Sequence, residues 1–573
     1  TTTRRTTTTT TTKPPPSKAE PPSLTNSQFD EAFDQLGLPV ELLEQCIEAL
    51  RDADGAADDF VALQRSCRAW RMLLAAARYE PLLYPPSSKR ITVAALGHVD
   101  SGKSTLLGRL LWECGNVDER QLSKVSQLAS DMGKGSFAYA YVLDKTKAER
   151  ERGITITSKV VELRTRTRSL GFVDVPGHRD FHRNAARGAS LADAALLLVP
   201  ADGNFAASIA RDNFVRGMVG GQTREHALLA RLVGMEQLIV AVNKMDCASV
   251  RYAHARFDEV KTEVAAVLVK VGWPKELVAK RVAFVPISAW HGDNVTKPSV
   301  NMPWWTGTTV EVAGPNGGVR GAGGKRRQRE VHVVTLLDAL ERVLYVPRRG
   351  DSGQQPLRMT VLEYNKIKGV GDVYVGRVES GTLKLGDEIK LVPRDGFKWA
   401  RGLRSSVAAH GVVRDIQSFH KPLAVARTGD VIGVALRDLC RPIPRQHELI
   451  VHRDDRTMTG RIASVVLHVK VLQAPNPLRR GFTPFAICRT MSAPMVLTAV
   501  DWVLGKRTGG KRDKQLDSLE VHDVAQCVFE PNHATLRNVY NPLTVEAFAH
   551  CAPLGRVALY VSSRITLIGK VVS

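Results

Sequence analysis

The sequence lacks the features that define several classes of protein. No stretch approaches the roughly 18–20 uninterrupted apolar residues that a membrane-spanning helix needs, so we expect no membrane partner. The 8 cysteines are scattered without a C-x-x-C pair, which argues against a disulfide framework or a zinc site. This usage fits a reducing compartment, and we expect a monomeric protein of the cytoplasm.

Acidic side chains are also scarce relative to basic ones. The 573 residues contain 58 Asp and Glu against 80 Lys and Arg, which gives a formal net charge of +22. Such a balance favours polyanionic partners, and nucleic acid is the partner expected here. The length predicts three or four domains, and a hydrophobic content of 43% is sufficient for their cores.

The N-terminal segment is of low complexity. Residues 1–35 begin "TTTRRTTTTTTTKPPPSK", a composition typical of a disordered tail. The tail lacks the amphipathic apolar face of a transit peptide, so a mitochondrial location is not favoured. Residues 36–84 have the apolar spacing of short helices, and "LPVELL" with "CRAWRMLL" resembles an F-box. A small helical appendage with an ordinary core is the favoured alternative.

Apolar runs alternate with helical patterns between residues 89 and 347. The runs "ITVAALG", "LGFVDV", "AALLLV", "LIVAVN" and "VAFVPIS" are typical of buried parallel strands, and "KSTLLGRLLWEC" and "TREHALLARLVG" are typical of helices. The alternation predicts an α/β doubly wound domain. From 356 to 450, and again from 460 to 573, short strands with Gly-bearing turns predict two β-barrels.

The stretch "GHVDSGKST", from Gly97 to Thr105, fits the phosphate-loop pattern G-x-x-x-x-G-K-[ST]. Gly97 and Gly102 allow backbone N–H groups to surround phosphates. Lys103 can reach the β and γ phosphates, and Ser104 can place its hydroxyl on Mg²⁺. The loop follows a predicted strand and precedes a predicted helix, whose N-terminus attracts anions. The predicted phosphate-binding set also includes Asp100, Ser101 and Thr105.

Two further segments complete the predicted phosphate site. In "DVPGH", which ends a strand-like run, Asp174 can hold Mg²⁺ through water and Gly177 can bring its amide toward a γ-phosphate. In "KAERERGITI", Lys147 to Ile156, Thr155 can supply a hydroxyl to Mg²⁺. The charges before it suit a loop that orders over nucleotide and is released after hydrolysis, although "KAERER" alone also fits a solvated face.

The base is predicted to be guanine. "NKMD" places Asn243, Lys244 and Asp246 directly after the run "LIVAV". A carboxylate there accepts both N1–H and the 2-amino hydrogen of guanine, whereas adenine offers neither donor in that arrangement. "SAW", Ser288–Trp290, includes Ala289 and follows "VAFVPI", where its backbone can meet guanine O6. The phosphate loop, "DVPGH", "NKMD" and "SAW" all follow strand ends, where open α/β sheets bind ligands.

These segments resemble the eukaryotic elongation factor 1-alpha family. The resemblance rests on "GHVDSGKST", "GKGSFAYAYVLDKTKAERERGITI", "DVPGHRDF" and "GGQTREHALLARLVGMEQLIVAVNKMD", and continues in the barrels with "GVGDVYVGRVESGTLKLGDEI" and "PLGRVALYVSSRITLIGK". The family includes eukaryotic release factor 3 and the ribosome-rescue GTPase that partners Pelota. The resemblance implies a P-loop GTPase domain followed by two β-barrels, with GTP or GDP and Mg²⁺ as cofactors.

The resemblance also implies the catalytic residues. His178 matches the family's catalytic histidine, which orients the attacking water when ribosomal RNA positions it. Val99 and Ile154 match the apolar gate that keeps this histidine out before activation. Ser104 and Thr155 match the Mg²⁺ ligands. Hydrolysis of this kind depends on positioning and charge neutralisation more than on covalent chemistry.

Two departures from the elongation factor affect the expected partner. "CRTMSAP" stands where the family has a stretch associated with aminoacyl-tRNA, and "RVALYV" places Tyr560 and Val561 where the family has Arg and Asp. We therefore favour a rescue or termination type of ribosomal GTPase that delivers a tRNA-shaped protein to the A site. An aminoacyl-tRNA carrier is one alternative, and a ribonucleoprotein component or assembly factor with structural GTP is another. The Gly-rich basic stretch 308–330 is either a contact to ribosomal RNA or a surface loop.

Overall fold

The computed structural model describes residues 90–573, except residues 134, 144–145, 153, 166, 211–219, 313–318, 321–325, 328, 348–354, 393–396, 399–403, 406–408, 440–447, 459–461, 475, 533–542 and 563. The predicted tail at 1–35 and the predicted helical segment at 36–84 lie outside the described residues. Within the described part, no helix is both long enough and apolar enough to cross a membrane.

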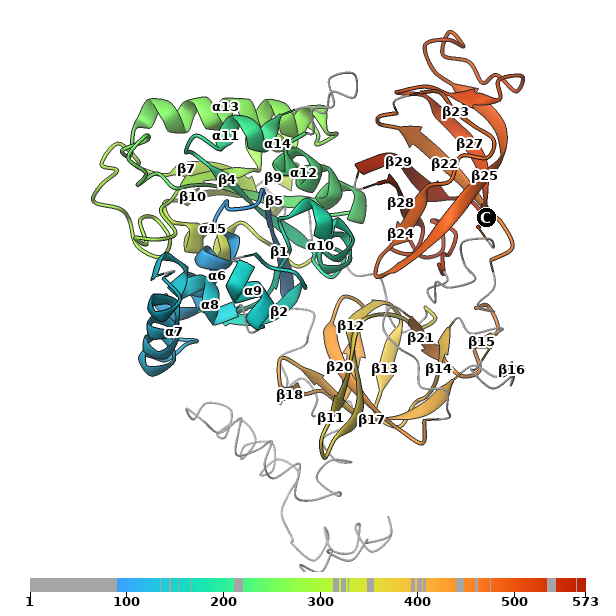
Figure 1. Cartoon of the computed structure of the whole chain (residues 1–573), viewed down its shortest axis with the longest axis horizontal. Helices are drawn as coiled ribbons and strands as arrows, with labels where there is room; N and C mark the ends of the chain where they lie inside the picture. The colour runs from blue at the N-terminus through green and yellow to red at the C-terminus, as the bar shows by residue number, and fades with distance from the viewer. Residues whose placement is uncertain are drawn as a thin grey trace, which may run out of the picture. The chain divides into compact units, whose positions relative to one another are not determined.

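The first described domain contains a six-stranded sheet (Figure 1). β2 runs antiparallel to β3, and the remaining neighbours are parallel. The strands, in spatial order, are β2 (Lys159–Arg164), β3 (Ser169–Asp174), β1 (Ile91–Gly97), β4 (Ala194–Pro200), β5 (Gln237–Asn243) and β6 (Ala283–Pro286). All five predicted strand runs are present, and β2 is an additional edge strand.

Helices pack on the sheet because its strands are apolar on both faces. Every residue of β1, β4 and β5 is buried. The helices are α6 (Lys103–Glu113), α7 (Glu119–Asp131), α8 (Ala138–Leu143), α9 (Lys147–Arg152), α10 (His182–Ala189), α11 (Phe205–Ile209), α12 (Gln222–Val233), α13 (His254–Lys270), α14 (Lys275–Lys280) and α15 (Leu336–Arg342), with 3₁₀ turns η2 (Gly135–Phe137) and η3 (Arg179–Phe181).

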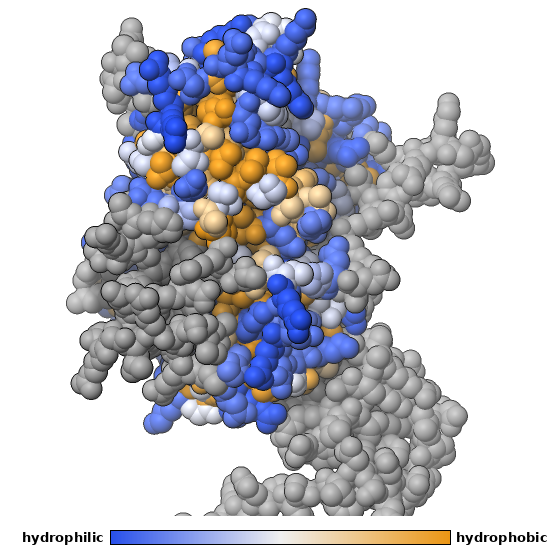
Figure 2. All heavy atoms as spheres, turned by 90° about the vertical axis from the view of Figure 1, so that its right-hand side faces the viewer, coloured by the Kyte–Doolittle hydropathy of each residue, from blue (hydrophilic) through white to orange (hydrophobic). Residues whose placement is uncertain are grey.

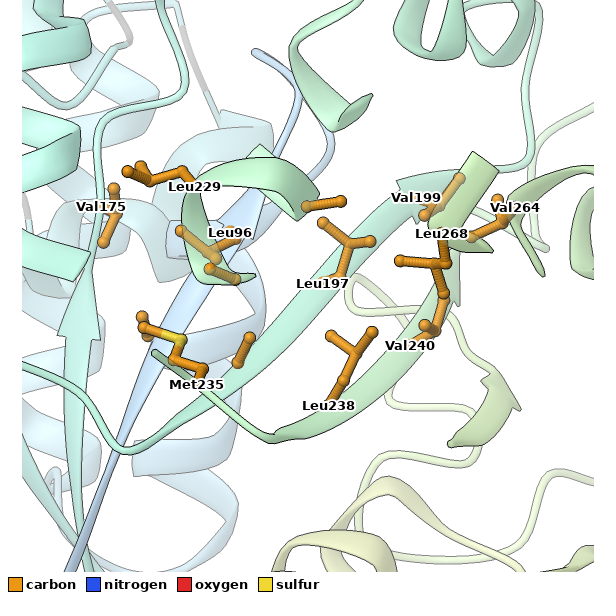
Figure 3. Close-up of a cluster of buried hydrophobic side chains, with 14 of the residues drawn as sticks. Leu96, Val175, Leu197, Val199, Leu229, Met235, Leu238, Val240, Val264 and Leu268 are labelled. Carbon is orange, nitrogen blue, oxygen red and sulfur yellow. The ribbon is translucent and has the colours of Figure 1, made fainter. Parts of the chain in front are cut away.

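The hydrophobic core is divided by the sheet into two clusters. One cluster joins β1, β4 and β5 to α12 and α13, and the other joins the same strands to α6 and α15. Figure 3 shows part of the first, where Val199 of β4 and Val240 of β5 lie beside Leu268 of α13. Because parallel strands need cover on both faces, this arrangement accounts for their continuous apolar runs. It confirms the predicted α/β class.

The stretch 308–330 is not a loop throughout. Its first residues form β7 (Thr308–Val312), which pairs in antiparallel fashion with β10 (Arg329–Val333). Between them lie the two-residue strands β8 (Val319–Arg320) and β9 (Arg326–Arg327). The composition of 308–330 indicated a Gly-rich loop, but the β-branched residues in "TTVEV" of β7 and "REVHV" of β10 suit paired strands.

The second domain is a sheet whose two ends meet. Its strands follow the order β14-β21-β11-β12-β20-β17-β18, and β14 also pairs with β17. They are β11 (Arg358–Ile367), β12 (Gly371–Ser380), β14 (Glu388–Val392), β17 (His410–Ser418), β18 (Lys421–Pro422), β20 (Val431–Arg437) and β21 (Leu449–His452). The short pairs are β13 (Thr382–Lys384) with β19 (Val425–Arg427) and β15 (Phe397–Lys398) with β16 (Arg404–Ser405).

The third domain is a closed six-stranded barrel in the order β22-β27-β25-β24-β28-β29. The strands are β22 (Val465–Val471), β24 (Phe485–Cys488), β25 (Met491–Leu504), β27 (Val524–Pro531), β28 (Arg556–Val561) and β29 (Arg564–Val571), with the short pair β23 (Leu478–Arg479) and β26 (Ser518–Leu519). Figure 2 shows the side of the molecule that lies on the right in Figure 1, where hydrophilic residues border a band of hydrophobic ones. The predicted fold class, an α/β P-loop domain followed by two β-barrels, is confirmed.

Buried charged side chains connect the α/β domain to both barrels. Arg377 of β12 donates to Asp193 and to the backbone oxygen of Leu191, each at 2.5 Å. Arg489, between β24 and β25, contacts Glu379 of β12 at 3.0 Å and donates to the backbone oxygen of Ser190 at 2.8 Å. Since all four charged residues are buried, they form one ionic junction shared by three domains. We call Asp193, Arg377, Glu379 and Arg489 the domain junction.

Candidate nucleotide-binding and hydrolysis site

The phosphate loop runs from the end of β1 to the start of α6. Gly97 and Gly102 have φ angles of 145° and 93°, which side chains rarely adopt. A Cβ on Gly102 would also collide with the side chain of Asn243. Asp100 has φ of 58°, so the loop turns sharply before the helix. The first turn of α6 contains Ser104 and Thr105, which places its free N–H groups at the loop.

Lys103 lies buried beneath this loop. Its ammonium donates to the backbone oxygens of Gly97 at 3.0 Å and His98 at 2.7 Å. Burial lowers the pKa of Lys103 to about 8, and the nearby carboxylates of Asp174 and Asp100 oppose that shift. A phosphate beside this ammonium would stabilise its charged form, because an opposite charge at close range favours ionisation.

Two observations indicate that the loop suits a phosphate group. The hydroxyl of Ser101 is fully buried, and it has no hydrogen-bond partner in the described part of the chain. Gly177 approaches Lys103 so closely that an added Cβ would collide with the ammonium. A buried cation with a glycine beside it leaves room for an anion and provides charge to hold it.

The three predicted Mg²⁺ ligands meet next to Lys103. The hydroxyl of Ser104 lies 3.1 Å from that of Thr155 and donates to the Asp174 carboxylate at 2.8 Å. They come from α6, from the segment before β2 and from the end of β3. Hard oxygen donors of this kind fit Mg²⁺, which takes few protein ligands and keeps several waters. These three side chains would hold Mg²⁺, which would supply positive charge next to a phosphate bound at the loop.

Glu149 on α9 anchors the segment that carries Thr155. Its carboxylate is 1% exposed, accepts from the backbone N–H of Ile156 at 3.1 Å and pairs with Lys159 at 2.8 Å. Burial alone would raise the pKa of Glu149, but hydrogen bonds from Lys159, Thr146 and Ile156 outweigh it and lower that pKa. The charged stretch "KAERER" is therefore not simply a solvated face, because one of its carboxylates is a buried anchor.

Asn243 joins the phosphate loop to the predicted guanine loop. Its side-chain amide donates to the backbone oxygen of Ser101 at 2.8 Å and accepts from the backbone N–H of Ala289 at 2.9 Å. Lys244 has φ of 66° and pairs with Asp202 at 2.8 Å. Asn243 thus fixes the separation of the phosphate and base sites.

The segments predicted to select the base are held by contacts from neighbouring side chains. Asp246 lies 3.9 Å from the His291 imidazole, and the buried Ser288 hydroxyl accepts from the His291 backbone N–H at 3.1 Å. Trp290 is exposed and makes an edge contact with the Tyr139 ring. Arg109, which the sequence motifs did not single out, donates to the backbone oxygens of Trp290 and His291 at 2.8 and 2.7 Å. No spacing rule points to Arg109, because its contacts are to backbone atoms far away in sequence.

His178 directly follows Gly177 and caps η3. Its Nδ1 accepts from the backbone N–H of Asp180 at 3.2 Å, and 38% of its side chain is exposed. Val99 and Ile154 are both half-buried. Their role as a gate for His178 stays a prediction, as does the catalytic role of the histidine itself.

Helix α12 touches the phosphate loop through two residues that no motif identified. The buried His226 accepts the backbone N–H of Gly97 at Nδ1, 2.9 Å away, and Gln222 accepts that of Val99 at 3.2 Å. Burial and the charge of Lys103 lower the pKa of His226 to about 3. The imidazole is therefore neutral at physiological pH and acts as an acceptor.

Comparison with known proteins agrees with this geometry. Residues 88–346 match the elongation factor Tu GTP binding domain, 371–439 match elongation factor Tu domain 2, and 464–572 match the GTP-eEF1A C-terminal domain-like family. Together the three matches span more than half of the chain. The chain belongs to the translational GTPase family, with GTP and GDP as its nucleotides and GTP hydrolysis as its activity.

Solved structures share the fold at low sequence identity. The Ski7 GTPase-like domain of S. cerevisiae, bound to GTP, is 15% identical with a TM-score of 0.60, covering 84% of this chain and 97% of that one. Translation elongation factor SelB from Methanococcus maripaludis, in complex with a GTP analogue, is 17% identical with a TM-score of 0.53, covering 85% and 79%. At these identities the likeness concerns the fold alone.

Proposed function

We propose that this GTPase acts on the ribosome, where it delivers a tRNA-shaped release or rescue factor to the A site and hydrolyses GTP there. The observation that carries the proposal is the cluster of Ser104, Thr155 and Asp174 beside Lys103, with His178 on the next loop. A γ-phosphate bound there would lie between the loop and the Thr155 segment. Loss of the γ-phosphate would remove the contacts that keep the Thr155 segment ordered.

Each side chain has a defined task in the proposed reaction. Ser104 and Thr155 would hold Mg²⁺, which would neutralise charge on the phosphate oxygens. Lys103 holds the β and γ phosphates by charge. His178 orients the attacking water, and it needs a partner to move it inward because its side chain is 38% exposed in the free chain. Positioning of this kind accounts for a slow intrinsic reaction that the ribosome accelerates.

The C-terminal barrel supports a protein cargo over aminoacyl-tRNA. Tyr560, which stands where the family's tRNA carriers have a charged residue, is 2% exposed and lies against the His182 ring at 5.2 Å. In "CRTMSAP", Ser492 is buried and its hydroxyl accepts from Arg187 at 2.9 Å. Both positions are engaged with α10 of the α/β domain, so they are not presented to a nucleic acid.

The catalytic assignment is tested with His178→Ala. We expect ribosome-stimulated hydrolysis to fall by about 10²–10⁴-fold, as for loss of a positioned acid–base group, while GTP affinity stays nearly unchanged. His550→Ala, at an exposed position on the C-terminal barrel, is the matched control and should behave like the wild type. Equal stimulated rates in the wild type and His178→Ala would refute the role.

The cargo is tested by capture with the GTP-bound full chain. We expect a release-factor-like protein to be retained and aminoacyl-tRNA to pass through, and the capture should disappear with GDP. Retention of aminoacyl-tRNA instead would identify an elongation-type carrier. Stoichiometric GTP without turnover, even with ribosomes present, would favour a ribonucleoprotein component with structural nucleotide.

A further inference from the structure

The outer face of the C-terminal barrel carries an ordered polar cluster that the nucleotide site does not use. Trp502 on β25, Gln526 on β27 and His468 on β22 lie on adjacent strands. The Gln526 amide oxygen accepts from the indole N–H at 3.3 Å and lies 2.9 Å from Nε2 of His468. Its amide nitrogen donates to Asp501 at 2.8 Å. These bonds fix the plane and position of the indole.

A basic turn, residues 505–514 with the sequence "GKRTGGKRDK", borders this cluster. Val503 and Asp513 exchange two backbone hydrogen bonds of 2.8 Å, which close the base of the turn. At its tip Gly509 and Gly510 have φ angles of 59° and 77°, and neither would meet a neighbour with an added Cβ. The turn is therefore a defined hairpin that projects from the barrel.

The turn displays positive charge on three lysines. Lys506, Lys511 and Lys514 are exposed, and none pairs with an acidic side chain among the described residues. Arg507 is different, because it folds back onto Asp523 at 2.7 Å. The Arg512 guanidinium lies 4.5 Å from the centre of the Trp502 ring. Lys470, on the same face of β22 as His468, is also exposed.

We propose that this surface, formed by Trp502, His468, Gln526 and the 505–514 turn, binds RNA. The exposed lysines of the turn supply positive charge that can contact a phosphate backbone, and this charge drives association by counterion release. The Arg512 guanidinium lies over the indole, and this pair offers a flat face on which an unpaired base stacks. The amide of Gln526 adds a fixed polar group at the edge of that platform.

An acidic protein is a weaker fit to the same surface. Such a partner would use the lysines but would have no need for an ordered indole–guanidinium pair. The inference rests on the proposed function only for the identity of the RNA, which would be ribosomal RNA. Binding itself requires neither ribosomes nor hydrolysis, so the two proposals fail separately.

The charge contribution is tested by fluorescence anisotropy with a short fluorescein-labelled single-stranded RNA and the GDP-bound full chain. Lys506→Glu, Lys511→Glu and Lys514→Glu combined should weaken binding by about tenfold or more. The slope of log affinity against log salt should become shallower by about 2, at about 0.7 per phosphate contact. Lys124→Glu, Lys261→Glu and Lys275→Glu combined, at exposed sites of the α/β domain, make the same change in net charge and should retain most of the affinity.

The stacking contribution is tested at Trp502. Trp502→Ala should weaken RNA binding by about fivefold or more, since a base stacked on an aromatic side chain contributes substantially to affinity. Trp502→Phe keeps a flat ring and should lose much less. Nucleotide affinity of every variant should equal that of the wild type, which shows that the chain has folded.

Three results would overturn the inference. If the two triple-lysine variants lose RNA affinity equally, RNA binding would come from the overall positive charge of the chain and not from this surface. Poly-L-glutamate that displaces the RNA at equal charge concentration would indicate an acidic-protein surface instead. An absence of RNA binding at low salt by the folded, nucleotide-bound chain would exclude the site, whatever the outcome at His178.

Discussion

At the scale of single residues, the sequence is most informative where a motif must touch the nucleotide. Ser104, Thr155 and Asp174 were predicted as a set, and their side chains meet within hydrogen-bonding distance. His226 and Arg109 were not predicted, although both hold the site in shape. Their bonds go to backbone atoms remote in sequence, and such partners leave no pattern of spacing or residue type. Motifs identify the groups that contact a ligand, whereas supporting groups emerge only from the fold.

His226 makes the phosphate loop sensitive to acid. Its pKa is about 3 in the folded chain and about 6.5 in an unfolded one, so the unfolded state binds more protons between these values. The stability that the neutral imidazole contributes is complete above about pH 6.5 and is lost as the pH falls toward 3. In His226→Gln, where an amide oxygen can accept from Gly97, the fall in melting temperature between pH 6.5 and 5 should be smaller than in the wild type. His550→Gln should leave it unchanged, and equal slopes in all three proteins would contradict the prediction.

We expect Asp246 to determine the choice of base. Asp246→Ala would remove the carboxylate that we expect to accept two hydrogens of guanine, and the guanine donors would then be left unpaired. We expect GTP affinity to fall by about tenfold or more, at about 1.5–3 kcal/mol for a hydrogen bond to a charged group. Affinity for ATP should stay weak, so the ratio of GTP affinity to ATP affinity should decrease. Calorimetric titration with both nucleotides measures it, and an unchanged ratio would show that other groups select the base.

At the scale of elements, the local sequence pattern was enough to predict some strands but not others. The buried strands were predicted because their apolar runs are continuous, as β1, β4 and β5 illustrate. β2 was missed because it is an edge strand with Lys159 and Glu162 in a short half-buried run, which does not stand out by hydrophobicity. The strands at the two ends of 308–330 were missed for a different reason. The glycines between them made the whole stretch look like a loop and concealed the strand pattern of β7 and β10. Composition averaged over a long window hides short paired elements.

Glu149 determines the order of the segment that carries Thr155. Glu149→Gln keeps the shape of the side chain but removes the charge that pairs with Lys159. We expect faster proteolytic cleavage near residues 147–157 in the GTP-bound chain, together with weaker Mg²⁺ dependence of nucleotide binding. Glu276→Gln, in an exposed ion pair with Lys280, is the matched control because such pairs contribute little. Wild-type cleavage rates in Glu149→Gln would show that the segment is held by other contacts.

At the scale of the whole molecule, the domain junction makes the three domains depend on one another. Arg377→Met removes one cation and leaves the buried Asp193 and Glu379 carboxylates with less compensation. Loss of one partner from a buried ion pair costs about 3–5 kcal/mol, so the melting temperature should fall and the barrels should separate from the α/β domain in solution scattering. Arg453→Ala, in the exposed pair with Glu388, should change stability by at most about 1 kcal/mol. An unchanged scattering profile in Arg377→Met would show that other contacts hold the domains.

One helix spans the distance between the nucleotide and the C-terminal barrel. The first half of α12 accepts hydrogen bonds from the phosphate loop through Gln222 and His226, and its last turn ends at Gly234, against the guanidinium of Arg556 on β28. A stiff rod fixed at both ends transmits any movement of one end to the other. A shift of the loop after phosphate release must therefore either carry the barrel with it or pull Arg556 away from Gly234, and a reporter at that contact would register hydrolysis from the far side of the molecule.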